Sequence, residues 1–408
     1  MVTRVPISHE PAQDVVFLLP GFFGFAQVGQ FFYYADRVAA VLESALWTRL
    51  GRRVPVCLLT TEPTDPLRDR QAFLEDQLLA YLPSDNRGQL NAAPDARIHL
   101  VGHSTGGLDA WLLLARTTLS GAPWSHPMNR LRERIRSVHA LAAPFYGTRV
   151  TLSPFARALA AHSLGALLSV GHLKDVLTTG LEVLGLGAGL LAQPTSLIAL
   201  ALGSVVETPD GREDAVKLLF SVCNDRGLLA DLKPDAMAEL HRRVEVDHVA
   251  EVTCYVTVPA DGLLRDPDSV ESRCFDLMYR EASGPYDSAW AAAAHAAETR
   301  LAHGLRQGTL PVIGHPGVTL RAVDGVVSDG IVNSCAQWLE GAALGAVVVA
   351  GHIDLIGHYR RVLLEVGPNA QPEPQVVNRG LLDSGSWFGD PELTRLYGAI
   401  AASIAAKA

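Results

Sequence analysis

Residues 98–112 read IHLVGHSTGGLDAWL, and this stretch decides the fold. It begins as an apolar run typical of a buried strand and ends with apolar residues at helical spacing. At the junction, Ser104 stands two residues after Gly102 and two before Gly106. Flanking glycines permit a sharp strand-to-helix turn, which holds the serine in strained geometry and exposes its hydroxyl at the carboxyl edge of a sheet. The pattern predicts a nucleophilic serine; the alternative is a serine that caps an ordinary helix.

The chain on either side of this stretch alternates between strands and helices. Strands that alternate with amphipathic helices predict a mostly parallel central sheet flanked by helices on both faces. In the helix expected over residues 65–83, Asp65 is the candidate N-cap and Pro66 takes the first helical position. The expected strands are residues 15–20, 54–59, 97–103, 137–144, 252–259, 318–323 and 346–352, and the expected helices are residues 31–50, 65–83, the segment after Ser104, residues 288–303 and the C-terminal residues from 391.

The alternation stops between about residues 148 and 247, where Leu, Ala and Gly dominate. A membrane-associated segment is one interpretation. However, Lys174, Asp175, Glu182 and Pro194 interrupt this region, so it holds no uninterrupted run of about 18 apolar residues. The pattern favours a helical insertion.

Composition excludes several classes of protein. The chain has 408 residues, 48% of them hydrophobic and 19% charged, which is enough apolar content for a large folded core. The net charge is −9 and no block of Lys or Arg is present, so nucleic acid is not an expected partner. The five cysteines are scattered and show no C-x-x-C pair, which indicates neither a zinc site nor a dense disulfide framework. The first residues, MVTRVPISHEPAQD, lack the order of a secretory signal, so we expect a cytoplasmic protein.

A nucleophilic serine requires a base, because its hydroxyl alone is a poor nucleophile. In the strand-turn-helix setting the partners follow along the chain in the order serine, acid, histidine. His352 lies at the end of the last apolar strand, where an α/β sheet places its ligand-facing loops. We therefore predict His352 as the base, with His358 and His315 as reserves.

The predicted acid is Asp329, in the stretch VVSDGIVNS between the late strands. Asp261 and Asp324 are rivals, since each is also followed by glycine and two aliphatic residues. Aspartates before glycine are common in turns and most of them are structural. The choice of Asp329 rests on the requirement that the acid reach the same edge of the sheet as Ser104.

The loop after the first strand, LLPGFFGF (residues 18–25), offers a backbone donor for a developing oxyanion. We expect the N–H of Phe22 to act with the N–H of Thr105, next to the predicted nucleophile. The alternative is a merely apolar loop. The glycines of this loop would let backbone approach a ligand closely. The residues expected to line a substrate pocket are Phe23, Phe25, His103 and Phe145.

Five short motifs occur in one order along the chain: PGFFGF at 20–25, GHSTGG at 102–107, APFYGT at 143–148, SDGIVNS at 328–334 and GHID at 351–354. Together they resemble the motifs of the α/β-hydrolase fold and, within it, of bacterial triacylglycerol lipases and carboxylesterases. The resemblance implies Ser104 as nucleophile, Asp329 as acid, His352 as base, and Phe22 and Thr105 as the backbone donors.

The chain also departs from this family pattern. Pro20 replaces a histidine before the first glycine, and Phe145 stands where the family has another histidine. Asp354 matches an aspartate that holds calcium in several of these lipases. His358, however, stands where they keep a glutamine, so we expect no calcium and no other metal or cofactor.

The resemblance implies a domain organisation. Residues 1–149 and 250–408 would form the α/β-hydrolase core, with an insertion at about 262–317, and residues 150–249 a helical lid or cap. This segment is either a lid that opens in transient contact with a lipid interface or a cap that stays closed.

The expected activity is hydrolysis of carboxylic esters with apolar acyl chains through an acyl-enzyme intermediate. The expected partner is thus a small-molecule or lipid ester. Two alternatives remain: an acyltransferase that uses the same three residues, and a non-catalytic, lipid-binding protein with this fold.

Overall fold

The computed structural model describes residues 10–22, 27–28, 31–35, 37–62, 64–82, 89–152, 227–246, 251–261, 270–284, 291–323, 327–365, 373–378 and 383–408. The predicted pocket residues Phe23 and Phe25 and the rival acid Asp324 lie outside these ranges, and so do residues 153–226 and 247–249 of the expected lid.

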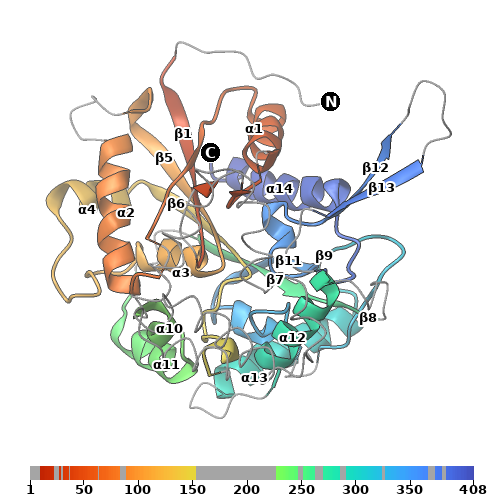
Figure 1. Cartoon of the computed structure of the whole chain (residues 1–408). Helices are drawn as coiled ribbons and strands as arrows, with labels where there is room; N and C mark the ends of the chain where they lie inside the picture. Colours follow the sequence, from red (N-terminus) through yellow and green to blue (C-terminus); the bar gives the residue numbers. More distant parts are fainter. Residues whose placement is uncertain are drawn as a thin grey trace, which may run out of the picture.

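A seven-stranded sheet forms the centre of the protein (Figure 1), with strand order β4-β1-β5-β6-β7-β11-β9. Each pair of neighbours runs parallel, which confirms the mostly parallel sheet that the alternating pattern predicts. The strands are nearly continuous apolar runs because helices cover both faces of a parallel sheet. The strands are β1 (Ala12–Leu19), β4 (Val56–Leu58), β5 (Ala92–His103), β6 (Ile135–Leu141), β7 (Glu251–Val258), β9 (Val312–Ile313) and β11 (Ala343–Val349).

Helices α1 (Arg37–Leu50) and α14 (Asp390–Ala405) lie side by side over one face of the sheet (Figure 1) and share one apolar core with it. The opposite face carries two further apolar clusters under the remaining helices. These helices are α2 (Leu67–Tyr81), α3 (Thr105–Leu112), α4 (His126–Arg132), α10 (Gly227–Asp231), α11 (Pro234–Arg243) and α13 (Ala291–Arg306), with α12 (Val270–Ala282) beside them.

Short elements complete the described chain, and a hairpin of two strands, β12 and β13, projects from the body (Figure 1). The short 3₁₀ helices are η1 (Arg149–Leu152), η2 (Ser334–Gln337) and η3 (Asp354–Ile356), and the small antiparallel pairs are β2 (Gln27–Val28) with β3 (Phe31–Phe32), β8 (Ala260–Asp261) with β10 (Thr319–Leu320), and β12 (Arg360–Glu365) with β13 (Glu373–Asn378).

Two local expectations are wrong at the start of helices. The helix expected from residue 31 begins at Arg37, because β3 occupies the residues before it and Tyr34 donates from its buried hydroxyl to Leu19 O at 2.9 Å. At α2, the cap position is Pro66, and the Leu67 N–H is capped by the Asp231 carboxylate of α10 at 2.8 Å. A partner that is distant in the sequence supplies the cap expected from Asp65.

The segment expected as an insertion at about 262–317 contains a strand of the central sheet. Val347 and Val348 of β11 pair in parallel with Val312 and Ile313, so β9 is the edge strand. A two-residue strand is too short to show alternation in the sequence. In the described part of the chain, no helix has both the length and the hydrophobicity needed to cross a membrane.

A row of buried polar side chains crosses the neighbouring strands β1, β5 and β6. Ser137 Oγ lies 2.8 Å from His99 Nδ1 and 3.1 Å from His139 Nε2. His99 Nε2 in turn lies 3.4 Å from the buried carboxylate of Asp14. Nδ1 of His139 has no hydrogen-bond partner among the described residues. Burial, and then the nearby His99, lower the pKa of His139 to about 3. His139 is therefore held neutral in the fold.

We expect His139 to destabilise the protein in acid. Its folded pKa lies below the ordinary value of about 6.5, so the unfolded chain binds the proton first as the pH falls. The free energy of unfolding that depends on neutral His139 is intact above pH 6.5 and is lost progressively down to about pH 3. The loss amounts to about 2–3 kcal/mol between pH 7 and pH 4.5. His139→Gln should show a smaller loss of stability over this interval when thermal unfolding is followed at both pH values. An equal loss in variant and wild type would contradict the prediction.

Candidate active site

Ser104 lies at a strained turn between β5 and α3. Its backbone has φ 55° and ψ −127°, a conformation that residues with a side chain rarely adopt. The Ser104 N–H donates to Leu141 O at 2.8 Å, and the Gly107 N–H donates to Ser104 O at 2.9 Å, so the turn is tied to the end of β6 and to the first turn of α3. Such strain is typical of functional turns. The serine therefore does not act as an ordinary helix cap, and its side chain accepts no capping hydrogen bond.

The glycines beside Ser104 are required by close approach of backbone. A Cβ at Gly102 would lie 2.1 Å from Gly106 O, and a Cβ at Gly106 would lie 2.2 Å from Leu19 O at the end of β1. Both distances are far below van der Waals contact, so no side chain fits at either position. The G-x-S-x-G spacing thus allows α3 to start directly against strands β5 and β1.

Asp329 and His352 meet through their side chains. Asp329 Oδ2 lies 2.8 Å from His352 Nδ1, and both side chains are almost completely buried. The same oxygen accepts from the Thr257 hydroxyl at 2.5 Å and from Gln337 Nε2 at 3.0 Å. Oδ1 accepts two backbone N–H groups, those of Ile331 and Val332, at 3.0 and 2.8 Å. All five neighbours of this carboxylate act as donors.

These donors keep the Asp329 carboxylate ionised despite its burial. Burial alone would raise its pKa, but the positive charge that His352 carries when protonated and the hydrogen bonds of His352, Thr257 and Val332 lower the pKa below its usual value. An ionised Asp329 accepts the Nδ1 proton of His352. Nε2 of His352 then carries the lone pair, which is the form required of a base.

The serine turn and the histidine loop are in direct contact. His103, the residue before Ser104, has its Nε2 2.8 Å from His352 O, and the two imidazole rings lie 4.7 Å apart. The His352 N–H donates to Asp329 O at 3.0 Å. The structure thus brings the segments of all three predicted catalytic residues together at the carboxyl edge of the sheet.

The loop after β1 packs against Ser104. A Cβ at Gly21 would lie 2.7 Å from Ser104 Cβ and 2.9 Å from His103 O. Phe22 follows directly and packs at the edge of the apolar cluster under α3 and α13, while Thr105 is the first residue of α3. The two predicted backbone donors therefore come from the loop beside Ser104 and from the helix N-terminus that follows it.

A buried ion pair that the sequence analysis missed holds this loop. Arg70 of α2 and Asp109 of α3 are fully buried, with Arg70 Nη2 2.5 Å from Asp109 Oδ2. The same nitrogen donates to Pro20 O at 3.0 Å and lies 3.5 Å from Gly21 O. Because C=O and N–H point in opposite directions across a trans peptide, this arrangement turns the N–H of Phe22 away from Arg70. The sequence does contain one sign of this ion pair: Asp109 is the single charged residue in the otherwise uncharged helix that follows Ser104.

The rival and reserve residues lie elsewhere. Asp261 is an exposed residue of β8. His315 packs edge-on against Trp387, and its Nδ1 accepts from the Gly317 N–H. His358 bonds through Nε2 to Tyr33 O at 2.9 Å.

Two residues expected to line a substrate pocket are placed differently. Both ring nitrogens of His103 bond to protein groups, Tyr33 and His352, so the ring is not available to a ligand. Phe145 is fully buried in the core, edge-on to Trp111 at 6.0 Å. Both residues belong to predicted motifs, GHSTGG and APFYGT, but the sequence does not show that each side chain points into the protein.

The surroundings of Asp354 do not fit a calcium ion. Its Oδ2 accepts from the Gly351 N–H at 2.6 Å and from the hydroxyls of Ser384 and Ser386 at 2.9 and 3.1 Å. Calcium needs six to eight oxygen ligands, whereas these neighbours act as hydrogen-bond donors. In the described ranges, no group of three or more His, Cys, Asp or Glu side chains is arranged to hold a metal ion.

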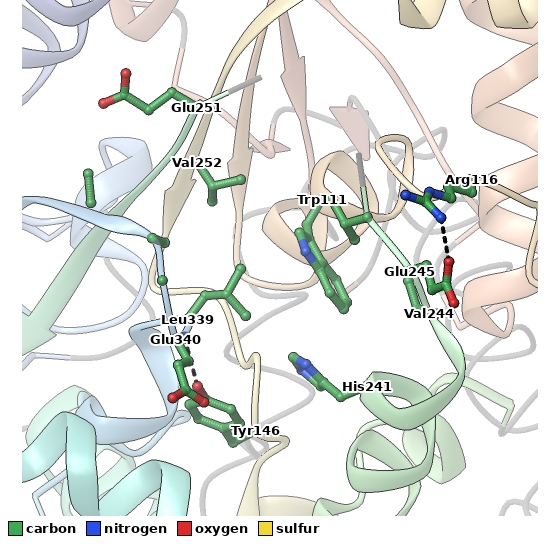
Figure 2. A pocket seen from close by; sticks show the side chains of 14 residues that line it. Trp111, Arg116, Tyr146, His241, Val244, Glu245, Glu251, Val252, Leu339 and Glu340 are labelled. Atoms are coloured by element: carbon green, nitrogen blue, oxygen red, sulfur yellow. Dashed lines mark hydrogen bonds and ion pairs between the residues drawn. The ribbon is translucent and has the colours of Figure 1, made fainter. Parts of the chain in front are cut away.

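A cavity of about 900 Å³ lies at the opposite end of the sheet (Figure 2). Val252 and Ala343, at the amino ends of β7 and β11, are among the residues that line it. The ring of His241 stacks on Trp111 and on Tyr146, with centroids 4.8 and 5.6 Å away. None of the predicted catalytic residues lines this cavity, so it is separate from the candidate site.

Together, the parallel sheet and the serine at its strand-to-helix turn define the α/β-hydrolase fold. Comparison with solved structures finds similar bacterial proteins. The lipase of Staphylococcus hyicus aligns over 99% of this chain and 98% of its own length, with a TM-score of 0.50 and 14% sequence identity. EstA from Clostridium botulinum (99% and 89% covered, 15% identity) and lipase 1 from Pelosinus fermentans (97% and 99%, 15% identity) give TM-scores of 0.46 and 0.44. The chain matches no protein-family model and no curated protein sequence.

Proposed function

We propose that the protein is a serine hydrolase of carboxylic esters with apolar acyl chains. The observation that carries this proposal is the Asp329 carboxylate 2.8 Å from His352 Nδ1, on a loop in contact with the strained turn of Ser104. A carboxylate, a histidine and a serine in these relations are the parts of an acyl-transfer site. The fold is compatible with this activity, but it also supports many others.

The proposed reaction has two halves. His352 takes the proton of the Ser104 hydroxyl, whose oxygen attacks the ester carbonyl carbon. The N–H groups of Phe22 and Thr105 donate to the oxyanion of the tetrahedral intermediate. Collapse of this intermediate releases the alcohol, which takes the proton from His352. Water, deprotonated by His352, then attacks the acyl-enzyme. The second intermediate collapses with cleavage of the bond to Ser104 Oγ, which regains its proton from His352 as the carboxylic acid leaves, while Asp329 holds the imidazole in place throughout.

The surroundings of the site favour an apolar acyl group. Ser104 and His352 are only 6% and 3% exposed, so a reacting ester is largely removed from water. Phe22 packs on the apolar cluster next to the site. An aliphatic chain gains free energy in such surroundings, about 0.8 kcal/mol for each buried CH₂. The proposal therefore predicts that activity depends on acyl length.

The test is a series of p-nitrophenyl esters of increasing acyl length, assayed with wild type and Ser104→Ala. We expect turnover by the wild type, covalent labelling by a fluorophosphonate, and loss of both in Ser104→Ala by at least about 10⁴-fold in kcat. Ser125→Ala is the matched control: Ser125 caps α4 and donates to the Glu75 carboxylate, and it contacts none of the predicted catalytic residues, so this variant should keep full activity.

Each outcome separates the proposal from its alternatives. Retained turnover in Ser104→Ala would remove this nucleophile. Ester formation that outruns hydrolysis when an alcohol is added in water would identify a transferase. No turnover and no labelling of the wild type at any acyl length would favour a non-catalytic protein.

A further inference from the structure

Tyr33 and His103 are two buried side chains that the proposed reaction does not use. His103 is the last residue of β5, and Tyr33 lies between β3 and α1; they are 1% and 6% exposed. The Tyr33 hydroxyl lies 2.8 Å from His103 Nδ1. On the other side of the ring, His103 Nε2 lies 2.8 Å from His352 O. Both ring nitrogens therefore have a partner.

The direction of these hydrogen bonds follows from their chemistry. A carbonyl oxygen only accepts, so Nε2 of His103 must carry a proton to bond His352 O. Burial, and then the nearby His352, lower the pKa of His103 well below its usual value, so the ring is neutral. Nδ1 then has only a lone pair, and the Tyr33 hydroxyl is the donor.

The Tyr33 oxygen also contacts the loop next to the nucleophile. A Cβ added at Gly21 would lie 2.5 Å from this hydroxyl oxygen, and the backbone of Gly21 is near enough to oppose the rise that burial causes in the pKa of Tyr33. One series of contacts thus runs from Gly21 through the Tyr33 hydroxyl and the His103 ring to His352 O.

The backbone of the same segment is tied to the histidine loop. His358 Nε2 bonds Tyr33 O at 2.9 Å, and the Ala35 N–H donates to Ile356 O at 2.9 Å. Tyr33 is consequently held to the loop of His352 through its main chain, while its hydroxyl reaches Gly21 and His103. A change at this hydroxyl is transmitted to both loops.

We propose that Tyr33 and His103 are positioning residues that fix three segments relative to one another: the loop of Gly21 and Phe22, the turn of Ser104, and the loop of His352. The inference rests on the proposed function, because it concerns the donors, nucleophile and base of that reaction. Misplacing such groups by about 1 Å lowers a rate by about 100-fold. The effect falls on the transition state and therefore on kcat.

We call the contacts of Gly21, Tyr33, His103 and His352 the relay. Tyr33→Phe tests it, since this change removes one hydroxyl and keeps the ring. We expect kcat to fall about 10- to 100-fold with KM changed by less than about threefold. The control is Tyr146→Phe, which removes another buried hydroxyl, one that accepts the Glu340 N–H at 2.9 Å in the wall of the distant cavity. Both variants should lose a similar small amount of thermal stability, and only Tyr33→Phe should lose kcat.

A double-mutant cycle with His103→Gln tests the connection itself. The glutamine amide can still donate towards His352 O but offers no ring nitrogen to Tyr33. If the two residues act in one relay, Tyr33→Phe combined with His103→Gln should lose no more kcat than the worse single variant. Losses that multiply would show independent roles and would overturn the relay.

The two proposals fail in distinguishable ways. A wild type that neither turns over esters nor reacts with a fluorophosphonate overturns the proposed function and the relay with it. An active wild type accompanied by a fully active Tyr33→Phe overturns the relay alone. If Tyr33→Phe does not fold, kcat and KM of His103→Gln are compared with those of the wild type instead. A loss of kcat with little change in KM supports the relay, and an unchanged kcat contradicts it.

Discussion

Asp329→Asn is expected to lower kcat by about 10³- to 10⁴-fold. The carboxylate accepts five hydrogen bonds, three on Oδ2 and two on Oδ1. An asparagine amide must direct its NH₂ either at the two backbone N–H groups or at the side chains of His352, Thr257 and Gln337. In both orientations the amide NH₂ faces groups that are themselves hydrogen-bond donors. In addition, a neutral amide no longer stabilises the imidazolium that His352 forms during the reaction. His352 then changes tautomer or position, and the base is lost.

The control for this prediction is Asp261→Asn. Asp261 is also followed by glycine but is exposed on β8, so its replacement should leave ester turnover unchanged. Comparison of kcat for the two variants, with circular dichroism to verify that each is folded, checks the prediction. If Asp261→Asn proved to be the inactive variant and Asp329→Asn the active one, the assignment of the acid would be reversed.

Two of the predicted catalytic residues follow strands of the central sheet. Ser104 follows β5 and His352 follows β11, and the carboxyl ends of parallel strands lie at one edge. Asp329 lies in the loop before η2, and its motif, SDGIVNS, is what the sequence offers for it. The family resemblance strengthened the choice among Asp261, Asp324 and Asp329. The sheet could be predicted because residues buried on both faces form long apolar runs.

The supporting contacts could not be predicted, because each depends on a partner that is remote in the chain. Arg70 and Asp109 are 39 positions apart, and nothing in either helix indicates which arginine meets which aspartate. Thr257 and Gln337 are ordinary polar residues until the fold places them on Asp329. Tyr33 falls within the helix predicted over residues 31–50, whereas its hydroxyl bonds the ring of His103, the residue before Ser104.

Gly21→Ala is expected to lower kcat by about 10²- to 10³-fold, comparable with removal of one oxyanion donor. The added methyl would lie 2.5 Å from the Tyr33 hydroxyl, 2.7 Å from Ser104 Cβ and 2.9 Å from His103 O. Two of these neighbours belong to the rigid turn of the nucleophile, so the loop itself must move. Its movement displaces the N–H of Phe22 from the oxyanion.

Gly398→Ala is the matched control, since an added Cβ there meets no atom within 4 Å and lies in helix α14. Alanine favours a helix over glycine, so this variant should be slightly more stable, by up to about 1 kcal/mol, and fully active. Two quantities should be measured for each variant: kcat and the rate of covalent labelling by a fluorophosphonate. Because the phosphonyl oxygen also needs the backbone donors, labelling should slow together with turnover in Gly21→Ala. Normal labelling with lost turnover would place the defect after acylation, away from the loop of Phe22.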